Sequence, residues 1–262
     1  MKQHLKAISV KKPEKGNMMC EDACKATGRY IAVSDGAGGG GVFADRWAQH
    51  LISQVPEEPI TSYEELSGWM EKIWNPFYEE HEVLAKNVGG IFLNKFYDEG
   101  SFATLVAAWC EAGKRVRWMA YGDSVVFHYD KTTGVLAHSF GDLSDFSQQP
   151  CLLNWKDEQE PEGFSSGVFN LEHPSYVFAC SDALAHYVMM MYAVAQGQEF
   201  ANLEGKSVNL MKVAKLRKVN FLKDVLKPLF RSLTGNTLAD YCESLHRKGL
   251  LALDDYSLAR LK

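Results

Sequence analysis

The sequence predicts an α+β fold in which antiparallel sheet is layered with helices. Strand-like apolar runs in the middle of the chain are separated by links of only three or four residues. Such short links join antiparallel neighbours. Two helical stripes precede these runs, and a helix and a strand follow them. This order lacks the regular strand–helix alternation of a doubly wound parallel sheet.

Size and charge exclude several classes of protein. The 262 residues contain 46% hydrophobic and 23% charged residues and carry a net charge of -5, which is ordinary for a soluble globular protein. Because there is no basic block, we expect no nucleic-acid partner. The N-terminus lacks the apolar segment of a signal peptide, and the longest apolar run, 187–195, is too short to span a bilayer. We expect a cytoplasmic protein without a membrane partner, and the sequence predicts no oligomeric state.

The six cysteines favour a reducing compartment, because none forms a CxxC pair or a zinc-ribbon spacing. Cys110 and Cys180 lie in strand-like runs, so we expect them to be small core residues. Cys20 and Cys24 leave open the alternative of a reactive pair.

The first elements are read from apolar spacing. We expect an opening strand and a loop in residues 1–16, and a strand over Arg29–Ser34. Phe43, Trp47 and Leu51 then recur every four residues, which is one face of a helix.

A second helical stripe runs from Tyr63 to Trp74. Pro76 is expected to break or restart this helix, since proline is tolerated only in the first turn. The helix is expected to resume to about Lys86 and to end before the loop at Gly89-Gly90.

The middle of the chain is predicted to be a strand meander. Its runs are Phe102–Cys110, Arg115–Tyr121, Val125–Tyr129, Val135–Ser139, Gly167–Leu171 and Tyr176–Cys180. We expect hairpins at the first short links, including the one at Gly122-Asp123-Ser124.

The last part of the chain returns to helices. Leu184–Ala195 is apolar almost all round and is expected to be a buried helix. Leu/Val spacing in a polar context suggests a helical insertion at about 196–234 within a single domain, 1–262. Thr237 is expected to cap a helix that Gly249 follows, before a last strand over Tyr256–Leu261.

Acidic residues recur at the ends of these predicted strands. The positions are Asp35, Asp123, Asp182 and Asp254, with Glu21-Asp22 shortly before the Arg29–Ser34 strand. If they converge at one rim of a sheet they would repel one another unless a cation neutralised them. All-oxygen ligation suits Mg²⁺ or Mn²⁺. The competing interpretation is that each is an ordinary turn or cap aspartate.

These acidic positions and the residues around them resemble the metal-dependent protein phosphatases of the 2C type, over nearly the whole chain. The similar segments follow the family's order: Glu21-Asp22-Ala23, Val33-Ser34-Asp35-Gly36-Ala37-Gly38-Gly39, Gly100-Ser101-Phe102-Ala103-Thr104, Gly122-Asp123-Ser124, Ser181-Asp182-Ala183 and Asp254-Asp255-Tyr256-Ser257. Each segment alone is a weak signal, and the six in order form a strong one.

The resemblance implies a four-layer α/β/β/α sandwich, with two mainly antiparallel sheets flanked by helices. It also implies a centre of two Mg²⁺ or Mn²⁺ ions. Asp35 would bridge the two ions, the Gly36 carbonyl would ligate one, and Asp182 and Asp254 would complete the pair.

Further metal contacts are implied around this pair. Glu21 would act through water with Asp22 beside it, and Asp123 would join Asp182 at a third, weaker ion. Two cations lower the pKa of a bridging water and place the resulting hydroxide in line with phosphorus. The resemblance thus implies a serine/threonine phosphatase acting on phosphoproteins in signalling, with Asp35 and Asp182 catalytic through the metal-activated water.

The chain departs from the family at its phosphate contacts. Asn17 stands where an arginine usually grips the phosphate, and Ala37 where some members carry a histidine that protonates the leaving group. Val125 and Ala183 replace an arginine and a glycine. Lys15 is the cation nearest to Asn17 and is predicted to contact the phosphate instead, without a bidentate fork.

Three other motifs compete with this interpretation. Gly36-x-Gly38-x-x-Gly41 fits a dinucleotide fingerprint, but two helices follow it rather than a helix and a parallel strand. Gly163-Phe164-Ser165-Ser166-Gly167 fits a nucleophile elbow without the required strand and helix. Gly205-Lys206-Ser207 lacks the upstream glycine of a phosphate-binding loop.

The alternative from another class is a phosphoprotein-binding or regulatory module with weak or no turnover. Asn17 and Ala37 favour it. Asp35, Asp182 and Asp254 favour the enzyme, because a pure binding module has no need of clustered acids.

Overall fold

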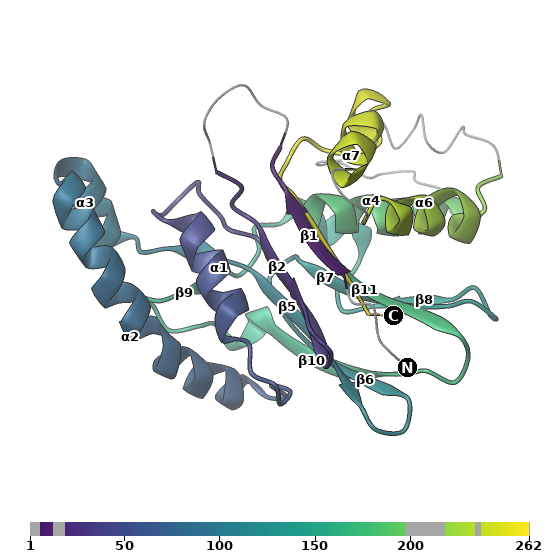
Figure 1. Cartoon of the computed structure of the whole chain (residues 1–262), viewed down its shortest axis with the longest axis horizontal. Coiled ribbons are helices and arrows are strands. Elements are labelled where there is room, and N and C mark those ends of the chain that lie inside the picture. The colour runs from purple at the N-terminus through teal and green to yellow at the C-terminus, as the bar shows by residue number, and fades with distance from the viewer. Residues whose placement is uncertain (1–5, 13–18, 198–217, 234–236, 262) are drawn as a thin grey trace.

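The computed structural model describes residues 6–12, 19–197, 218–233 and 237–261, which form four layers (Figure 1). Two five-stranded antiparallel sheets form the middle layers. In spatial order, the first comprises β1 (Lys6–Val10), β12 (Tyr256–Leu261), β11 (Ser175–Cys180), β7 (Val125–Asp130) and β8 (Leu136–His138). The second comprises β10 (Phe164–Asn170), β6 (Arg115–Tyr121), β5 (Leu105–Glu111), β3 (Tyr30–Ser34) and β2 (Ala23–Ala26). A short antiparallel pair joins β4 (Phe102–Ala103) to β9 (Leu153–Asn154).

Helices form the two outer layers (Figure 1). On the side of the second sheet lie α1 (Ala44–Gln54), α2 (Tyr63–Val88) and α3 (Gly90–Asp98). On the side of the first sheet lie α4 (Asp182–Ala195), α6 (Lys227–Arg231) and α7 (Thr237–Arg247). Short helical turns occur at Leu143–Ser147, Pro161–Gly163 and Phe221–Leu226. Among the described residues, no helix combines the length and the apolar character needed to cross a membrane.

Alternation along the strands separates the layers. On β3, Ile31 and Val33 belong to the core between the sheets, whereas Tyr30 and Ala32 belong to the core beneath α1 and α2. Successive side chains of a strand point to opposite faces, so a strand buried on both faces reads as a continuous apolar run. This explains why the Arg29–Ser34 run is apolar from Tyr30 to Val33 without alternation.

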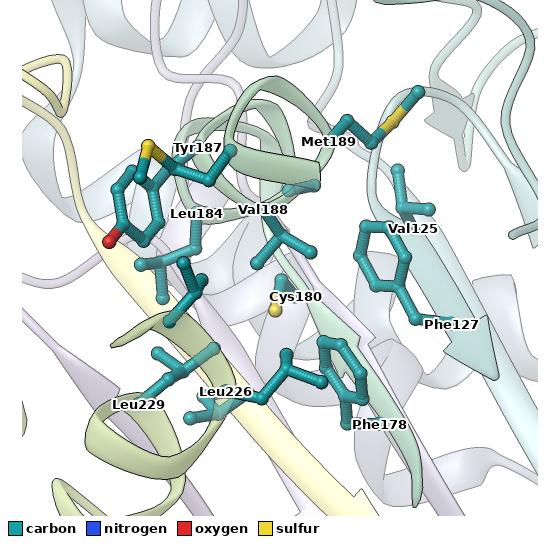
Figure 2. Close-up of a cluster of buried hydrophobic side chains, with 14 of the residues drawn as sticks. Val125, Phe127, Phe178, Cys180, Leu184, Tyr187, Val188, Met189, Leu226 and Leu229 are labelled. Atoms are coloured by element: carbon teal, nitrogen blue, oxygen red, sulfur yellow. The ribbon is translucent and has the colours of Figure 1, made fainter. Parts of the chain in front are cut away.

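The third core lies between the first sheet and its helices (Figure 2). Phe127, Phe178 and Cys180 from the strands face Leu184 of α4 and Leu229 of α6. Cys180, Leu184 and Leu229 are fully buried. The expectation of a buried helix over Leu184–Ala195 and of a core Cys180 is therefore confirmed.

Pro76 does not break α2, contrary to the sequence-based expectation, and the helix runs unbroken from Tyr63 to Val88. Proline removes one helical hydrogen bond and crowds the preceding turn. The buried side chains of Ile73 and Phe77 continue the apolar stripe across it. His50 Nε2 of α1 lies 2.8 Å from the Ile73 carbonyl, which gives the preceding turn a tertiary partner.

The link Gly122-Asp123-Ser124 is not a hairpin, which corrects another expectation. It carries the chain from β6 in one sheet to β7 in the other. A hairpin and a sheet-to-sheet crossover can have links of the same length, so link length alone did not distinguish them. Cys110, expected in the core, is exposed at the penultimate position of β5.

Several other expectations can be placed. Gly249 follows the last turn of α7 with φ 69°, as predicted. Ser165 lies inside β10 and not at a strand-to-helix turn, so the nucleophile-elbow geometry is absent there. Within the expected insertion at 196–234, residues 221–231 are helical. Residues 198–217 and 234–236, with Lys206 and Ser207, lie outside the described residues.

Candidate metal centre

Five carboxylates from distant parts of the chain share one cavity at the strand ends. The cavity has a volume of about 280 Å³. Its lining includes Glu21, Asp35, Asp123, Asp182 and Asp254, together with Gly36, Ala37, Gly38, Thr104, Pro150 and Leu152. Of the described residues that line it, none is Lys, Arg or His. The cavity is therefore strongly electronegative.

Strand ends bring these carboxylates together. Asp35 follows β3, Asp182 follows β11 and begins α4, and Asp254 shortly precedes β12. Ser181 ties the last two regions together, because its hydroxyl accepts the Ser257 N–H at 2.9 Å. Its own N–H donates to the Ser257 carbonyl at 3.2 Å.

Thr104 holds the Asp35 and Asp123 regions together from the break between β4 and β5. Its Oγ1 accepts the Asp35 N–H at 3.1 Å and lies 2.7 Å from Ser124 Oγ. Its N–H donates to the Asp35 carbonyl at 2.8 Å. Thr104 and Ser124 are both buried. The Thr104 hydroxyl thus fixes the backbone of Asp35 and contacts Ser124, which is the neighbour of Asp123.

The glycines after Asp35 leave space for Glu21. A Cβ on Gly36 would lie 2.6 Å from the Glu21 carbonyl oxygen and 2.7 Å from that of Ala44. A Cβ on Gly38 would overlap Glu21 Oε1. The close approach of these backbones therefore requires a residue without a side chain at Gly36, whereas a side chain at Gly38 would displace the Glu21 carboxylate.

The carboxylates of the centre are hard to ionise together. Burial raises the pKa of Asp35 well above its ordinary value, and the charges of Asp22 and Asp182 raise it further. Burial is also the main cause of the raised pKa of Glu21. Burial and converging negative charges together produce such shifts, and the charge of Lys12 offsets only part of the rise at Glu21.

Asp22 does not line this cavity, although, in addition to burial, its charge raises the pKa of Asp35. It is 4% exposed, and neither of its carboxylate oxygens has a hydrogen-bond partner among the described residues. Burial raises the pKa of Asp22 to about 8, although the nearby Ser181 hydroxyl opposes the shift. Buried carboxylates are normally paired or bound to a metal, so these orphaned oxygens fit a nearby cation.

The donor set fits hard divalent cations, because every candidate ligand is an oxygen. In the described part of the chain, however, no three His, Cys, Asp or Glu side chains are arranged to hold a metal ion as they stand. The carboxylates share a cavity without forming a closed coordination shell. The all-oxygen donor set and the raised pKa values of Asp35, Glu21 and Asp22 support a metal centre more directly than the spacing of the carboxylates does.

Asp255 was not predicted as a site residue, although it is next to Asp254. It is 4% exposed, and its two carboxylate oxygens accept the N–H groups of Lys12 at 2.7 Å and Glu21 at 2.6 Å. The doubled aspartate before the last strand was the available signal. Lys15 and Asn17 lie outside the described residues.

The structure disfavours a reactive Cys20–Cys24 pair. Burial raises the pKa of both thiols, that of Cys24 to about 11, and Asp22 adds to both shifts. The thiolate is the reactive form of cysteine, so both side chains stay protonated near neutral pH.

No protein-family model matches the chain. No curated protein matches it. Solved structures do match it over nearly its whole length. The serine/threonine phosphatase Stp1 from Staphylococcus aureus is 12% identical, with 100% of this chain and 95% of that chain covered and a TM-score of 0.56.

Two further matches are similar in extent. The Mycobacterium tuberculosis serine/threonine phosphatase PstP/Ppp is 17% identical, with 99% and 98% of the two chains covered and a TM-score of 0.56. The catalytic domain of PstP in complex with 2 manganese ions is 16% identical, with 99% and 97% covered and a TM-score of 0.54. The chain therefore shares the fold of 2C-type serine/threonine phosphatases, and the predicted α+β four-layer sandwich is confirmed.

Proposed function

We propose that this chain, which has the fold of the 2C-type phosphatases, is a metal-dependent phosphatase for phosphoserine and phosphothreonine in proteins. One observation carries the proposal. Five carboxylates from separate segments line a single cavity that has no basic lining residue among those described. Such a cavity suits cations, and cations in turn suit a phosphate group. A cytoplasmic role in signalling belongs to the same proposal.

Two Mg²⁺ or Mn²⁺ ions would be held by Asp35, the Gly36 carbonyl, Asp182 and Asp254. Glu21 would act through water with Asp22 beside it, and Asp123 with Asp182 would hold a third ion more weakly. When bound, such ions supply an activated water and neutralise the phosphoryl oxygens.

The chain's own groups position these donors. Thr104 fixes the backbone of Asp35, and Asp255 fixes that of Glu21. Pro150 and Leu152 form an apolar part of the cavity wall and would exclude water from one side of a bound phosphate. In the proposal Lys15 contacts the phosphate in place of the usual arginine.

A second function remains a candidate because of one cavity residue. Ala37 lines the cavity where some members of the family carry a histidine, and its methyl group cannot protonate a leaving group. This observation favours a phosphoprotein-binding or regulatory module with weak or no turnover. The two candidates differ in turnover and agree in metal-dependent binding of phosphoprotein.

Hydrolysis of p-nitrophenyl phosphate and of phosphothreonine peptides, with Mn²⁺, with Mg²⁺ and with EDTA, tests the proposal. We expect turnover with either ion and none with EDTA. Folded protein that binds a phosphopeptide but turns over no substrate with any divalent ion would establish the binding module instead.

A further inference from the structure

Two more cavities continue from the candidate metal centre along the 149–160 segment. The nearer one, of about 400 Å³, shares Pro150 and Leu152 with the metal centre. The farther one, of about 490 Å³, lies against α2 and shares Asp157 and Glu158 with the nearer one. The three cavities therefore form a continuous series, in which each shares lining residues with the next. We call the two outer ones together the acidic groove.

The charges of the acidic groove have one predominant sign. Asp157, Glu158 and Glu160 line the nearer cavity, and Glu71 joins the first two in the farther one. Lys156 is the single basic residue among the described residues of the lining, and its Nζ lies 3.5 Å from Asp157 Oδ1. Glu158 and Glu160 are exposed, so their charges face solvent.

Hydrogen bonds to neighbouring elements fix the backbone segment that lines the acidic groove. Asn154 is buried, and its Nδ2 donates to the Glu99 carbonyl at 2.9 Å and to Asp157 at 3.2 Å. The Glu160 N–H donates to the hydroxyl of Tyr121 at 2.8 Å. These contacts attach the segment to the sheet and to the end of α3. The acidic side chains therefore stand on a fixed backbone.

We infer that the acidic groove binds the polypeptide on one side of the phosphorylated residue, and that it selects flanks rich in lysine or arginine. The inference rests on the proposed function, because the phosphorylated residue must enter the metal centre for its flank to reach the groove. Complementary charge steers binding and rejects like-charged partners. Trp74 is half-buried and lines the farther cavity together with Glu71, and tryptophan rings attract cationic side chains.

Fluorescence anisotropy with labelled peptides tests the inference without depending on turnover. The probes contain a non-hydrolysable phosphonate analogue of phosphothreonine, flanked by lysines, alanines or glutamates, in Mn²⁺ and 50 mM salt. We expect the lysine-flanked peptide to bind about tenfold more tightly than the glutamate-flanked one. The difference should shrink in 500 mM salt, because exposed charges are screened.

Two variants locate the effect. Glu158→Gln/Glu160→Gln keeps the side-chain shapes and should reduce the preference for lysine flanks by about three- to tenfold. Glu172→Gln, a matched change at an exposed acid outside the groove, should leave the preference unchanged. Equal affinity for the three peptides, or a preference that survives the double variant, overturns the inference.

Further measurements separate this inference from the proposed function. A lysine-flanked peptide without phosphonate should bind more weakly, and equal binding would show that the groove acts independently of the metal centre and overturn the inference. Turnover of p-nitrophenyl phosphate with no effect of the flank would reject the groove alone. Flank-dependent binding without turnover of any substrate would reject the proposed hydrolysis alone.

Discussion

Oδ2 of Asp255 accepts the backbone N–H of Glu21 at 2.6 Å, across 234 positions of the chain. Its Oδ1 accepts the N–H of Lys12 at 2.7 Å. One buried carboxylate thus binds Lys12 and Glu21, which flank the sequence segment that contains Lys15 and Asn17. The position of Glu21 in the metal centre therefore depends on a residue that does not line the cavity.

Replacing Asp255 should uncouple Glu21 from the centre. Hydrogen bonds to a charged acceptor contribute about 1.5–3 kcal/mol each, so we expect Asp255→Ala to lower the free energy of unfolding by about 2–4 kcal/mol. Asp255→Asn keeps one acceptor oxygen and should lose less. Urea denaturation measures the stability, and calorimetric titration with Mn²⁺ measures the affinity of the folded variants. Unchanged affinity in a folded Asp255→Ala protein would contradict a positioning role.

Asp35→Asn should separate stability from activity. Because burial and neighbouring acids raise the pKa of Asp35, its ionised form opposes folding when no cation is present, and a neutral amide should relieve about 1–2 kcal/mol of this cost. We expect a higher Tm than wild type in EDTA, a smaller increase in Tm on adding Mn²⁺, and no phosphatase activity. Asp182→Asn should also abolish activity. A wild-type Tm that does not respond to Mn²⁺ or Mg²⁺ would argue against the metal centre.

Two neighbouring glycines provide a matched test of the Glu21 position. A Cβ at Gly38 would overlap the Glu21 carboxylate, whereas one at Gly39 meets no atom within 4 Å. Because a side chain can move aside, Gly38→Ala should keep its Tm within about 2 °C and weaken Mn²⁺ binding by about tenfold, on the scale of displaced metal contacts. Gly39→Ala should resemble wild type in both measurements. Equal Mn²⁺ affinities for the two variants would show that Glu21 contributes little.

His81 should make the stability depend on pH. It is 5% exposed, lies 2.8 Å from the Phe77 carbonyl through Nδ1, and burial lowers its pKa. The unfolded chain then binds the proton more readily, so stability is full above the ordinary pKa of about 6.5 and is lost as pH falls toward the lowered folded value.

His81→Leu should therefore reduce the loss of stability between pH 7.5 and 5.5. One such group contributes at most about 1.4 kcal/mol per pH unit. His50, His128 and His138, whose pKa values burial also lowers, should retain part of the slope. Urea denaturation across this range measures the change, and parallel profiles for the two proteins would refute the assignment.

Lys15→Ala should raise KM for phosphopeptides if Lys15 replaces the missing arginine. A single point-charge contact to a phosphate suggests an increase of about three- to tenfold, with kcat less affected. Lys11→Ala, another change of a lysine in the same N-terminal region, serves as the control. The same KM in wild type and Lys15→Ala would remove Lys15 from the site.

Much of the fold and most of the candidate site could be predicted from the sequence. Asp35, Asp182 and Asp254 each stand beside a strand, and strand ends that meet at one rim bring such residues into one cavity. Apolar spacing of helical period predicted α1, and a run that is apolar almost all round predicted the buried α4. These features are local in sequence, so a linear pattern records them.

What the sequence did not predict depends on distant partners. The link at Gly122–Ser124 has the length of a hairpin, and only the pairing of β6 and β7 with different neighbours makes it a crossover. The unbroken α2 has tertiary contacts on both sides of Pro76. The role of Asp255 could be predicted only from the positions of Glu21 and Lys12, which lie beside it in the folded chain. No local pattern carries this information.

The position of β12 affects when the molecule can be assembled. In its sheet, β12 lies between β1 and β11, and β1 pairs with it from Lys6–Arg260 to Val10–Tyr256. During synthesis β1 therefore emerges early but cannot pair until β12 has left the ribosome. Pairings of such sequence separation close late and slowly. Because Asp254 and Asp255 precede β12, a nascent chain cannot complete the acidic cavity early, and metal acquisition would follow the closure of this sheet.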